Sequence, residues 1–140
     1  MNEVHSGLWI GNAQEIRDPR KLAALGITTV IDIAANEEPA TLPSDFTYVR
    51  VPLNDGGGNE DARLFLAIQT VANVVRSGSP AAIACSYGMS RAPTVTAFGL
   101  SEVLNKPATE IIQRIAEQRS LDVNPILWNH TESVVEKFRN

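Results

Sequence analysis

Residues 81–94 limit what this chain can fold into more than any other stretch. Their sequence is Ala-Ala-Ile-Ala-Cys-Ser-Tyr-Gly-Met-Ser-Arg-Ala-Pro-Thr. A short apolar run ends at Cys85, the only cysteine of the chain, and a small, polar loop containing Gly88 follows it. From Arg91 the residues are compatible with a helix, and Pro93 falls in the first turn, where its missing N–H group is harmless. The segment therefore predicts a strand, a loop and a helix in succession.

This order of elements predicts a site for an anion. Successive N–H groups of a tight loop, continued by the free N–H groups of a helix N-terminus, form a concave surface of positive potential. The same field favours the thiolate over the thiol of Cys85, and the Arg91 guanidinium can hold two phosphate oxygens in a bidentate fork. A nucleophile beneath a bound phosphate is typical of phosphoryl transfer. The predicted phosphate-binding residues are Ser86, Tyr87, Gly88, Met89, Ser90 and Arg91.

A purely structural cysteine is the competing interpretation. Lone cysteines are often buried packing residues, and an arginine six positions after a cysteine also arises by chance. Gly88 inside the loop, the apolar run before Cys85 and the lack of a second cysteine in the sequence favour the catalytic interpretation.

Length and composition are those of one globular domain over residues 1–140. A chain of 140 residues, 44% hydrophobic and 20% charged, buries one core but not two. The formal net charge of -4 argues against nucleic acids and anionic membranes as partners. One cysteine cannot form an internal disulfide, Met1–His5 lacks the basic start of a signal peptide, and no run approaches the ~20 apolar residues of a membrane span. We therefore expect a cytoplasmic protein, and a monomer.

Strand and helix patterns alternate along the chain, which predicts an α/β domain. The expected fold is a central, mainly parallel sheet of about four or five strands flanked by helices, most of them on or beside one end of the sheet. Ligands of such sheets bind at the carboxyl ends of the strands, where Cys85 lies. Strands are predicted at 7–11 (as an edge strand), 27–34, 46–52 and 81–85, and helices at 18–26, 60–77, 91–105, 111–116 and 126–138.

Asp55 is the candidate proton donor. Expelling an alkoxide or phenoxide from phosphate requires one, and a carboxylic acid is the usual choice. Asp55 follows the strand ending at Val51–Pro52 and precedes three glycines, whose composition predicts a mobile loop. The alternative is that Asn-Asp-Gly simply begins a turn. Asp61 is a reserve candidate, although an acid is also favourable in the first turn of a helix, and Asp32, within a strand, is interpreted as structural.

The sequence predicts no metal site and no cofactor. His5 and His130 are isolated, and no group of His, Asp and Cys has metal-ligand spacing, so a metallophosphatase is not expected. The aromatic residues outside the loop are interpreted as packing residues: Trp9, Trp128, Tyr48 and Phe98.

The chain resembles a known family in several segments. Cys85-x5-Arg91 is the C-x5-R signature of cysteine-dependent protein phosphatases, and the full loop resembles that of the dual-specificity phosphatases. The segments 8–12, 25–31 and 124–125 resemble that family's opening segment, next strand and last helix, so the likeness covers essentially the whole chain.

The resemblance implies a phosphatase that acts through a phosphocysteine intermediate, with Asp55 in the place of the family's loop aspartate. Its implied substrates are phosphorylated proteins or small phosphoesters, and its implied inhibitors are phosphate, vanadate and tungstate. Two positions depart from the family pattern: Ala84 replaces the usual histidine, and Ala92 replaces a residue with a hydroxyl. The histidine helps to order the loop, and the hydroxyl helps the thiolate to leave, so we expect activity to be reduced or tuned to another substrate. The alternatives are a phosphate-binding interaction module of little or no activity, and a sulfurtransferase that carries a persulfide on Cys85.

Overall fold

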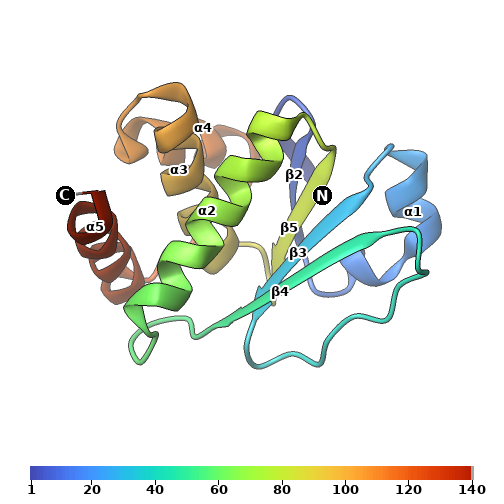
Figure 1. Ribbon diagram of the computed structural model, residues 1–140, viewed down its shortest axis with the longest axis horizontal. Coiled ribbons are helices and arrows are strands. Elements are labelled where there is room, and N and C mark those ends of the chain that lie inside the picture. Colours follow the sequence, from blue (N-terminus) through green and yellow to red (C-terminus); the bar gives the residue numbers. More distant parts are fainter. Residues whose placement is uncertain (140) are drawn as a thin grey trace.

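A five-stranded sheet crosses the middle of the molecule in the order β1-β2-β5-β3-β4 (Figure 1). The computed structural model describes residues 1–139. The strands are β1 (Asn2–His5), β2 (Leu8–Asn12), β3 (Thr29–Ala34), β4 (Thr47–Leu53) and β5 (Ala81–Cys85). The pairs β2–β5, β5–β3 and β3–β4 are parallel, whereas β1 runs antiparallel to β2. The predicted mainly parallel sheet is therefore confirmed.

The position predicted for the first strand was wrong. Residues 7–11, expected at the edge, contribute to β2, which lies between β1 and β5. β1 forms the edge instead. Its sequence is largely polar and carries no apolar alternation, and pairing with the backbone of β2 places it in the sheet. Local residue patterns do not report such pairing.

Capping residues mark the start of α1 and the end of α2. The Asp18 carboxylate accepts the N–H groups of Arg20 and Lys21 at 3.2 Å and starts α1. Gly78, with φ +73°, ends α2 in the left-handed conformation that glycine adopts without strain. Within residues 1–139, none of the helices has the length and apolar character that a membrane span requires. The helical segments are the 3-10 turn η1 (Glu15–Arg17), α1 (Pro19–Ala24), α2 (Asp61–Ser77), α3 (Arg91–Leu104), α4 (Ala108–Gln118) and α5 (Pro125–Arg139).

The sheet separates a large core from a small one. Helices α2 to α5 lie on one face, so they cover a face of the sheet rather than one end, whereas η1, α1 and the long loop before β4 lie on the other (Figure 1). Side chains of β5 alternate between the two: Ile83 and Cys85 belong to the large core, and Ala82 and Ala84 to the small one. Cys85 therefore ends its strand on the helical face, at the start of the loop that leads into α3.

Candidate active site

The predicted phosphate loop is present between β5 and α3. Cys85 is the last residue of β5 and is 2% exposed. Its Sγ accepts the N–H of Gly88 at 3.2 Å and the N–H of Ala92 at 3.4 Å. The loop thus curls around the sulfur with N–H groups directed toward it.

Arg91 opens α3 and is 6% exposed. Its Nη1 donates to Asn36 Oδ1 at 2.8 Å and to the Leu53 carbonyl at 2.9 Å, and its Nη2 donates to Ser86 Oγ at 3.1 Å. All of these partners are neutral, and the buried Nε has no partner among the described residues. A buried guanidinium that keeps a free N–H group and is hydrogen-bonded to neutral groups is suited to an anionic ligand.

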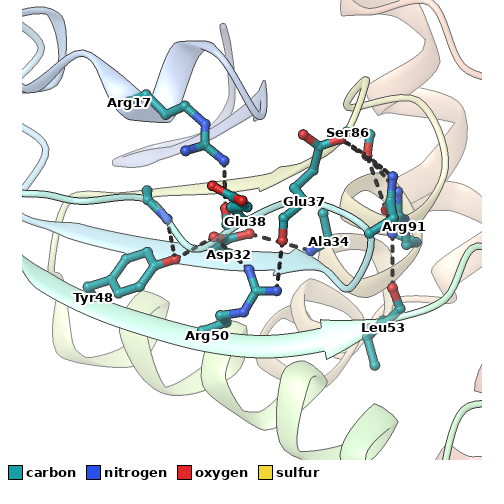
Figure 2. A network of polar contacts seen from close by, with 12 residues as sticks. Arg17, Asp32, Ala34, Glu37, Glu38, Tyr48, Arg50, Leu53, Ser86 and Arg91 are labelled. Carbon is teal, nitrogen blue, oxygen red and sulfur yellow. Dashed lines mark hydrogen bonds and ion pairs between the residues drawn. The ribbon is translucent and has the colours of Figure 1, made fainter.

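A polar network on the other side of the loop holds Ser86 in place (Figure 2). Ser86 Oγ lies 2.9 Å from Glu37 Oε2, and the carbonyl of Glu37 accepts a hydrogen bond from Arg50 Nη2 at 2.9 Å. Arg50 also pairs with the buried Asp32 at 3.2 Å, and the hydroxyl of Tyr48 donates to the same carboxylate. Burial and the neighbouring Asp32 carboxylate raise the pKa of Tyr48 above its ordinary value. Asp32 therefore holds β3 to β4, in agreement with its structural interpretation.

Gly88 and Arg119 together shape the loop. Gly88 has φ +70°, and a Cβ there would collide with the guanidinium of Arg119 and lie 2.7 Å from the Gly11 carbonyl oxygen. Arg119 Nε donates to the carbonyl of Gly88 at 2.7 Å, and its Nη2 to that of Tyr87 at 3.2 Å. Because these carbonyls are bound on the outer side, the N–H groups of the same peptide units face inward. Arg119 was not predicted from the sequence, since an arginine at the end of an ordinary helix carries no local signal.

Asp55 lies in the loop between β4 and α2, next to the phosphate loop. Its Oδ1 accepts the hydroxyl of Ser90 at 2.6 Å, and its carbonyl accepts Asn124 Nδ2 at 3.2 Å. The N–H of Asn124 in turn donates to Ser90 Oγ at 2.9 Å. The glycine-rich loop is closed by Asn59, which bonds to both backbone groups of Asn54 at 2.7 and 2.9 Å. Oδ2 of Asp55 has no hydrogen-bond partner among the described residues.

One pocket of about 90 Å³ brings the three candidate catalytic residues together. It adjoins a shallower hollow that is lined by Asn36, Asn54 and Ser86 and that shares Asp55, Tyr87 and Arg91 with the pocket. The pocket is lined by Asp55, Cys85, Tyr87, Met89, Ser90, Arg91 and Asp122.

The reserve candidate Asp61 does not line this pocket. It opens α2, and its carboxylate binds His130 Nε2 at 2.7 Å and Lys137 Nζ at 2.9 Å, both from α5. These hydrogen bonds, with that from His130 first, lower the pKa of Asp61 below its ordinary value. Asp61 therefore joins two helices.

The two alanines that depart from the family pattern are completely buried. Ala84 lies opposite Asp32 of β3 and packs in the small core, on the face of the sheet away from Cys85. Ala92 lies in the first turn of α3, and its N–H still reaches Cys85 Sγ. The loop therefore folds around the sulfur with an apolar residue at both positions.

Comparison with known proteins identifies the family. The family model described as the dual specificity phosphatase catalytic domain matches residues 8–138. The chain belongs to the dual specificity phosphatase family. It is 29% identical over 133 residues to mouse dual specificity protein phosphatase 13B, covering 89% of this chain and 67% of that one. The chain spans about half, 52%, of the length of two further curated relatives that it matches, the dual specificity protein phosphatases 15 of Mus musculus and Rattus norvegicus.

Two crystal structures share the fold of this dual specificity phosphatase domain. Human DUSP28 has a TM-score of 0.86 and 20% identity, over 99% of this chain and 98% of that one. A mouse putative dual specificity phosphatase complexed with zinc tungstate has a TM-score of 0.84 and 21% identity, over 98% of this chain and 87% of that one. The family predicted from the phosphate loop is confirmed, and the matched range includes Cys85, Arg91 and Asp55.

Proposed function

We propose that this dual specificity phosphatase domain hydrolyses phosphate monoesters on proteins, or on small molecules, through a phosphocysteine intermediate. One observation carries the proposal. Arg91, whose buried Nε has no partner among the described residues, lines the same small pocket as Asp55 and as Cys85, whose sulfur accepts N–H groups of the loop. Together they supply an anion clamp, a nucleophile and a proton donor.

In the first step, Cys85 Sγ attacks phosphorus and an S–P bond forms. The P–O bond to the leaving group breaks, and protonated Asp55 gives its proton to the departing oxygen. Ser90 occupies Oδ1, so the unpartnered Oδ2 is the oxygen that faces the leaving group. Arg91 and the N–H groups of the loop hold the remaining phosphate oxygens, as their inward direction allows.

In the second step, water attacks phosphorus and the S–P bond breaks, which returns the thiolate. Asp55 takes the proton of the water and is ready for another cycle. No electron is gained or lost in either step, and the products are the dephosphorylated alcohol or phenol and inorganic phosphate.

Phosphate release from an activated aryl phosphate tests the proposal. The wild-type domain is expected to turn over, and Cys85→Ser to lose turnover while keeping its affinity for tungstate, because the cradle consists of backbone N–H groups and Arg91. Arg91→Lys is expected to lose both affinity and rate, since an ammonium lacks the planar fork. Undiminished hydrolysis by Cys85→Ser would reject the cysteine mechanism.

A phosphate-binding module without turnover is the second candidate, and Ala92 is the observation that favours it. Its methyl group offers the thiolate no hydroxyl during hydrolysis of the phosphocysteine. Tungstate binding by the wild-type protein, without phosphate release from any aryl phosphate, would select this candidate. Transfer of sulfur from thiosulfate to cyanide would select the sulfurtransferase.

A further inference from the structure

The charges around the pocket are distributed unevenly. Arg91 is the sole basic side chain among the residues that line the pocket and the adjoining hollow, and it lies at the bottom with 6% of its surface exposed. Two acidic side chains, Asp55 and Asp122, line the same pocket. A third carboxylate, that of Glu37, bonds to Ser86 in the hollow. The rim of the pocket is therefore acidic above a single buried cation.

Arg119 does not supply a second cation to this rim. Each of its three nitrogen atoms donates a hydrogen bond: Nε and Nη2 to carbonyls of the phosphate loop, and Nη1 to the Ile10 carbonyl and to Asn2 Oδ1. These acceptors fix the guanidinium on the outer side of the loop. Moving it to the rim would break hydrogen bonds that shape the cradle.

Asp122 is the acidic residue most available to a substrate. It is exposed, and its carboxylate makes no hydrogen bond or ion pair with another described residue. Its own N–H donates to the Met89 carbonyl at 2.9 Å, so the backbone of Asp122 is attached directly to the phosphate loop. The position of the carboxylate at the rim is thus set by backbone contacts that a change of side chain would preserve.

Arg91 sets the position of the bound phosphate. That position in turn determines which substrate groups lie beside the Asp122 carboxylate. A phosphate held by Nε and by the N–H groups of the loop fills the bottom of the pocket. The groups that flank the phosphorylated residue then lie at the rim, next to the Asp122 carboxylate. A cation in that place is attracted, whereas a carboxylate or second phosphate meets a like charge without a compensating arginine.

We propose that Asp122 selects singly phosphorylated segments in which a lysine or arginine adjoins the phosphorylated residue, and disfavours segments with an acidic or second phosphorylated neighbour. This inference rests on the proposed function for its site and goes beyond it by naming the substrate class. The Asp122 carboxylate acts by attracting a positive side chain and repelling a negative one at the rim of the pocket.

Three phosphotyrosyl peptides of one length test the inference, with Lys, Glu or phosphoserine next to the phosphotyrosine. All three peptides release the same tyrosine side chain, so their dependence on Asp55 is the same and cancels in the comparison. In low salt, kcat/KM is expected to fall in the order Lys, Glu, phosphoserine, with Lys and Glu differing roughly 3- to 10-fold, as exposed charge pairs allow. The difference is expected to shrink in about 0.5 M salt, where the Debye length is only a few ångströms.

Variants of one residue assign the preference. Asp122→Asn is expected to bring the Lys-to-Glu ratio close to 1, Asp122→Glu to retain it, and Asp122→Lys to invert it. Asp45→Asn is the matched control, because Asp45 is an exposed acid just before β4, at the opposite end of the strand from Asp55. It removes the same charge and is expected to keep the wild-type ratio. An unchanged ratio in Asp122→Asn, or equal rates for the Lys and Glu peptides with the wild type, would overturn the inference.

Affinity measured with Cys85→Ser separates this inference from the proposed function. Turnover without any preference among the peptides would leave the phosphatase proposal standing and reject the role of Asp122. A preference for the Lys peptide in binding, in a wild-type protein that releases no phosphate, would reject the phosphatase and support the role of Asp122 in a binding module. The unphosphorylated Lys peptide is expected not to compete, since Arg91 then has no anion to hold.

Discussion

The hydroxyl of Ser90 donates to Oδ1 of Asp55 at 2.6 Å and joins the phosphate loop to the loop that carries the proton donor. Ser90 Oγ also accepts the N–H of Asn124 at 2.9 Å. This contact leaves the hydroxyl proton of Ser90 to point at the Asp55 carboxylate. Asp55 is thereby oriented by the same loop that is to hold the phosphate.

Removal of this hydroxyl is expected to weaken proton donation. In Ser90→Ala, kcat/KM for an unactivated aryl or alkyl phosphate should fall roughly 10- to 100-fold, as the loss of a hydrogen bond to a charged group predicts. Asp55→Ala should cost more, roughly 10²- to 10⁴-fold. Rates with leaving groups of high and low pKa measure both effects, because a good leaving group barely needs the proton.

A double variant identifies the route by which Ser90 acts. If it works through Asp55, Ser90→Ala should cost little in the Asp55→Ala background. An equal loss in both backgrounds would assign Ser90 to phosphate binding alone. A larger loss in Asp61→Ala than in Asp55→Ala would show that the proton donor is wrongly assigned.

Arg119 is expected to act on the cradle and not on proton transfer. Arg119→Gln removes the donors that hold the carbonyls of Tyr87 and Gly88, so tungstate should bind about 10-fold more weakly or worse. The rate should fall by the same factor for good and poor leaving groups, which distinguishes this variant from Asp55→Ala. Gly88→Ala, which forces a Cβ against the same guanidinium, should give the same pattern with a larger loss.

The methyl group of Ala92 predicts a slow second step. A departing thiolate without its usual hydroxyl lacks a hydrogen bond worth about 0.5 to 3 kcal/mol, so hydrolysis of the phosphocysteine should limit turnover. Rapid mixing with an activated aryl phosphate should show a burst of leaving group equal to the enzyme concentration. Ala92→Ser should raise the steady rate and shrink the burst.

If the wild type shows no burst and Ala92→Ser does not change the steady rate, another group already donates a hydrogen bond to the departing thiolate. Thr94 Oγ1 is the candidate, since it is buried one turn into α3 and has no hydrogen-bond partner among the described residues. Thr94→Val in the same assay would then produce the burst.

Asp61 makes the stability of the domain depend on pH in the acid range. The hydrogen bonds from His130 and Lys137 lower its pKa below the ordinary 3.8, so the folded state binds its proton less readily than the unfolded state. The stabilisation is complete above pH 3.8 and is lost as the pH falls through the folded pKa. Asp61→Asn should therefore lower the urea midpoint at pH 5 and have less effect at pH 3. Asp45→Asn should show no such change, and an Asp61→Asn effect equal at both pH values would contradict the mechanism.

The parts of the site that are local in sequence are the parts that sequence reasoning predicted. The apolar run of β5, the glycine in the loop and the proline in the first turn of α3 are neighbours, and local preferences suffice for each of them. Asp55 lies in the loop after β4, as the end of the strand pattern at Val51–Pro52 predicted, and its role as proton donor stays a prediction. Its bond to Ser90 was not predicted, since the two residues lie 35 positions apart.

The features that sequence reasoning missed depend on tertiary contacts. β1 is polar and owes its place to backbone pairing, which leaves no alternation to detect. The glycine loop resembled a mobile segment by composition, yet the structure shows Asn59 closing it through both backbone groups of Asn54. Glu37 and Asn36 lie in a segment with no regular pattern, and their relation to Ser86 and Arg91 exists only in the folded chain.

The contacts of Arg119 also predict when the cradle forms as the chain folds. They reach the carbonyl of Ile10, which lies 109 positions earlier, and that of Gly88, which lies 31 positions earlier. Contacts between such distant residues carry the largest loop-closure cost and form slowly. During refolding, helical circular dichroism is expected to recover before the affinity for tungstate, and Arg119→Gln to bring the two signals closer together. The capacity to hold an anion is then a property acquired at the end of folding, after the strand and helix on either side of the loop have formed.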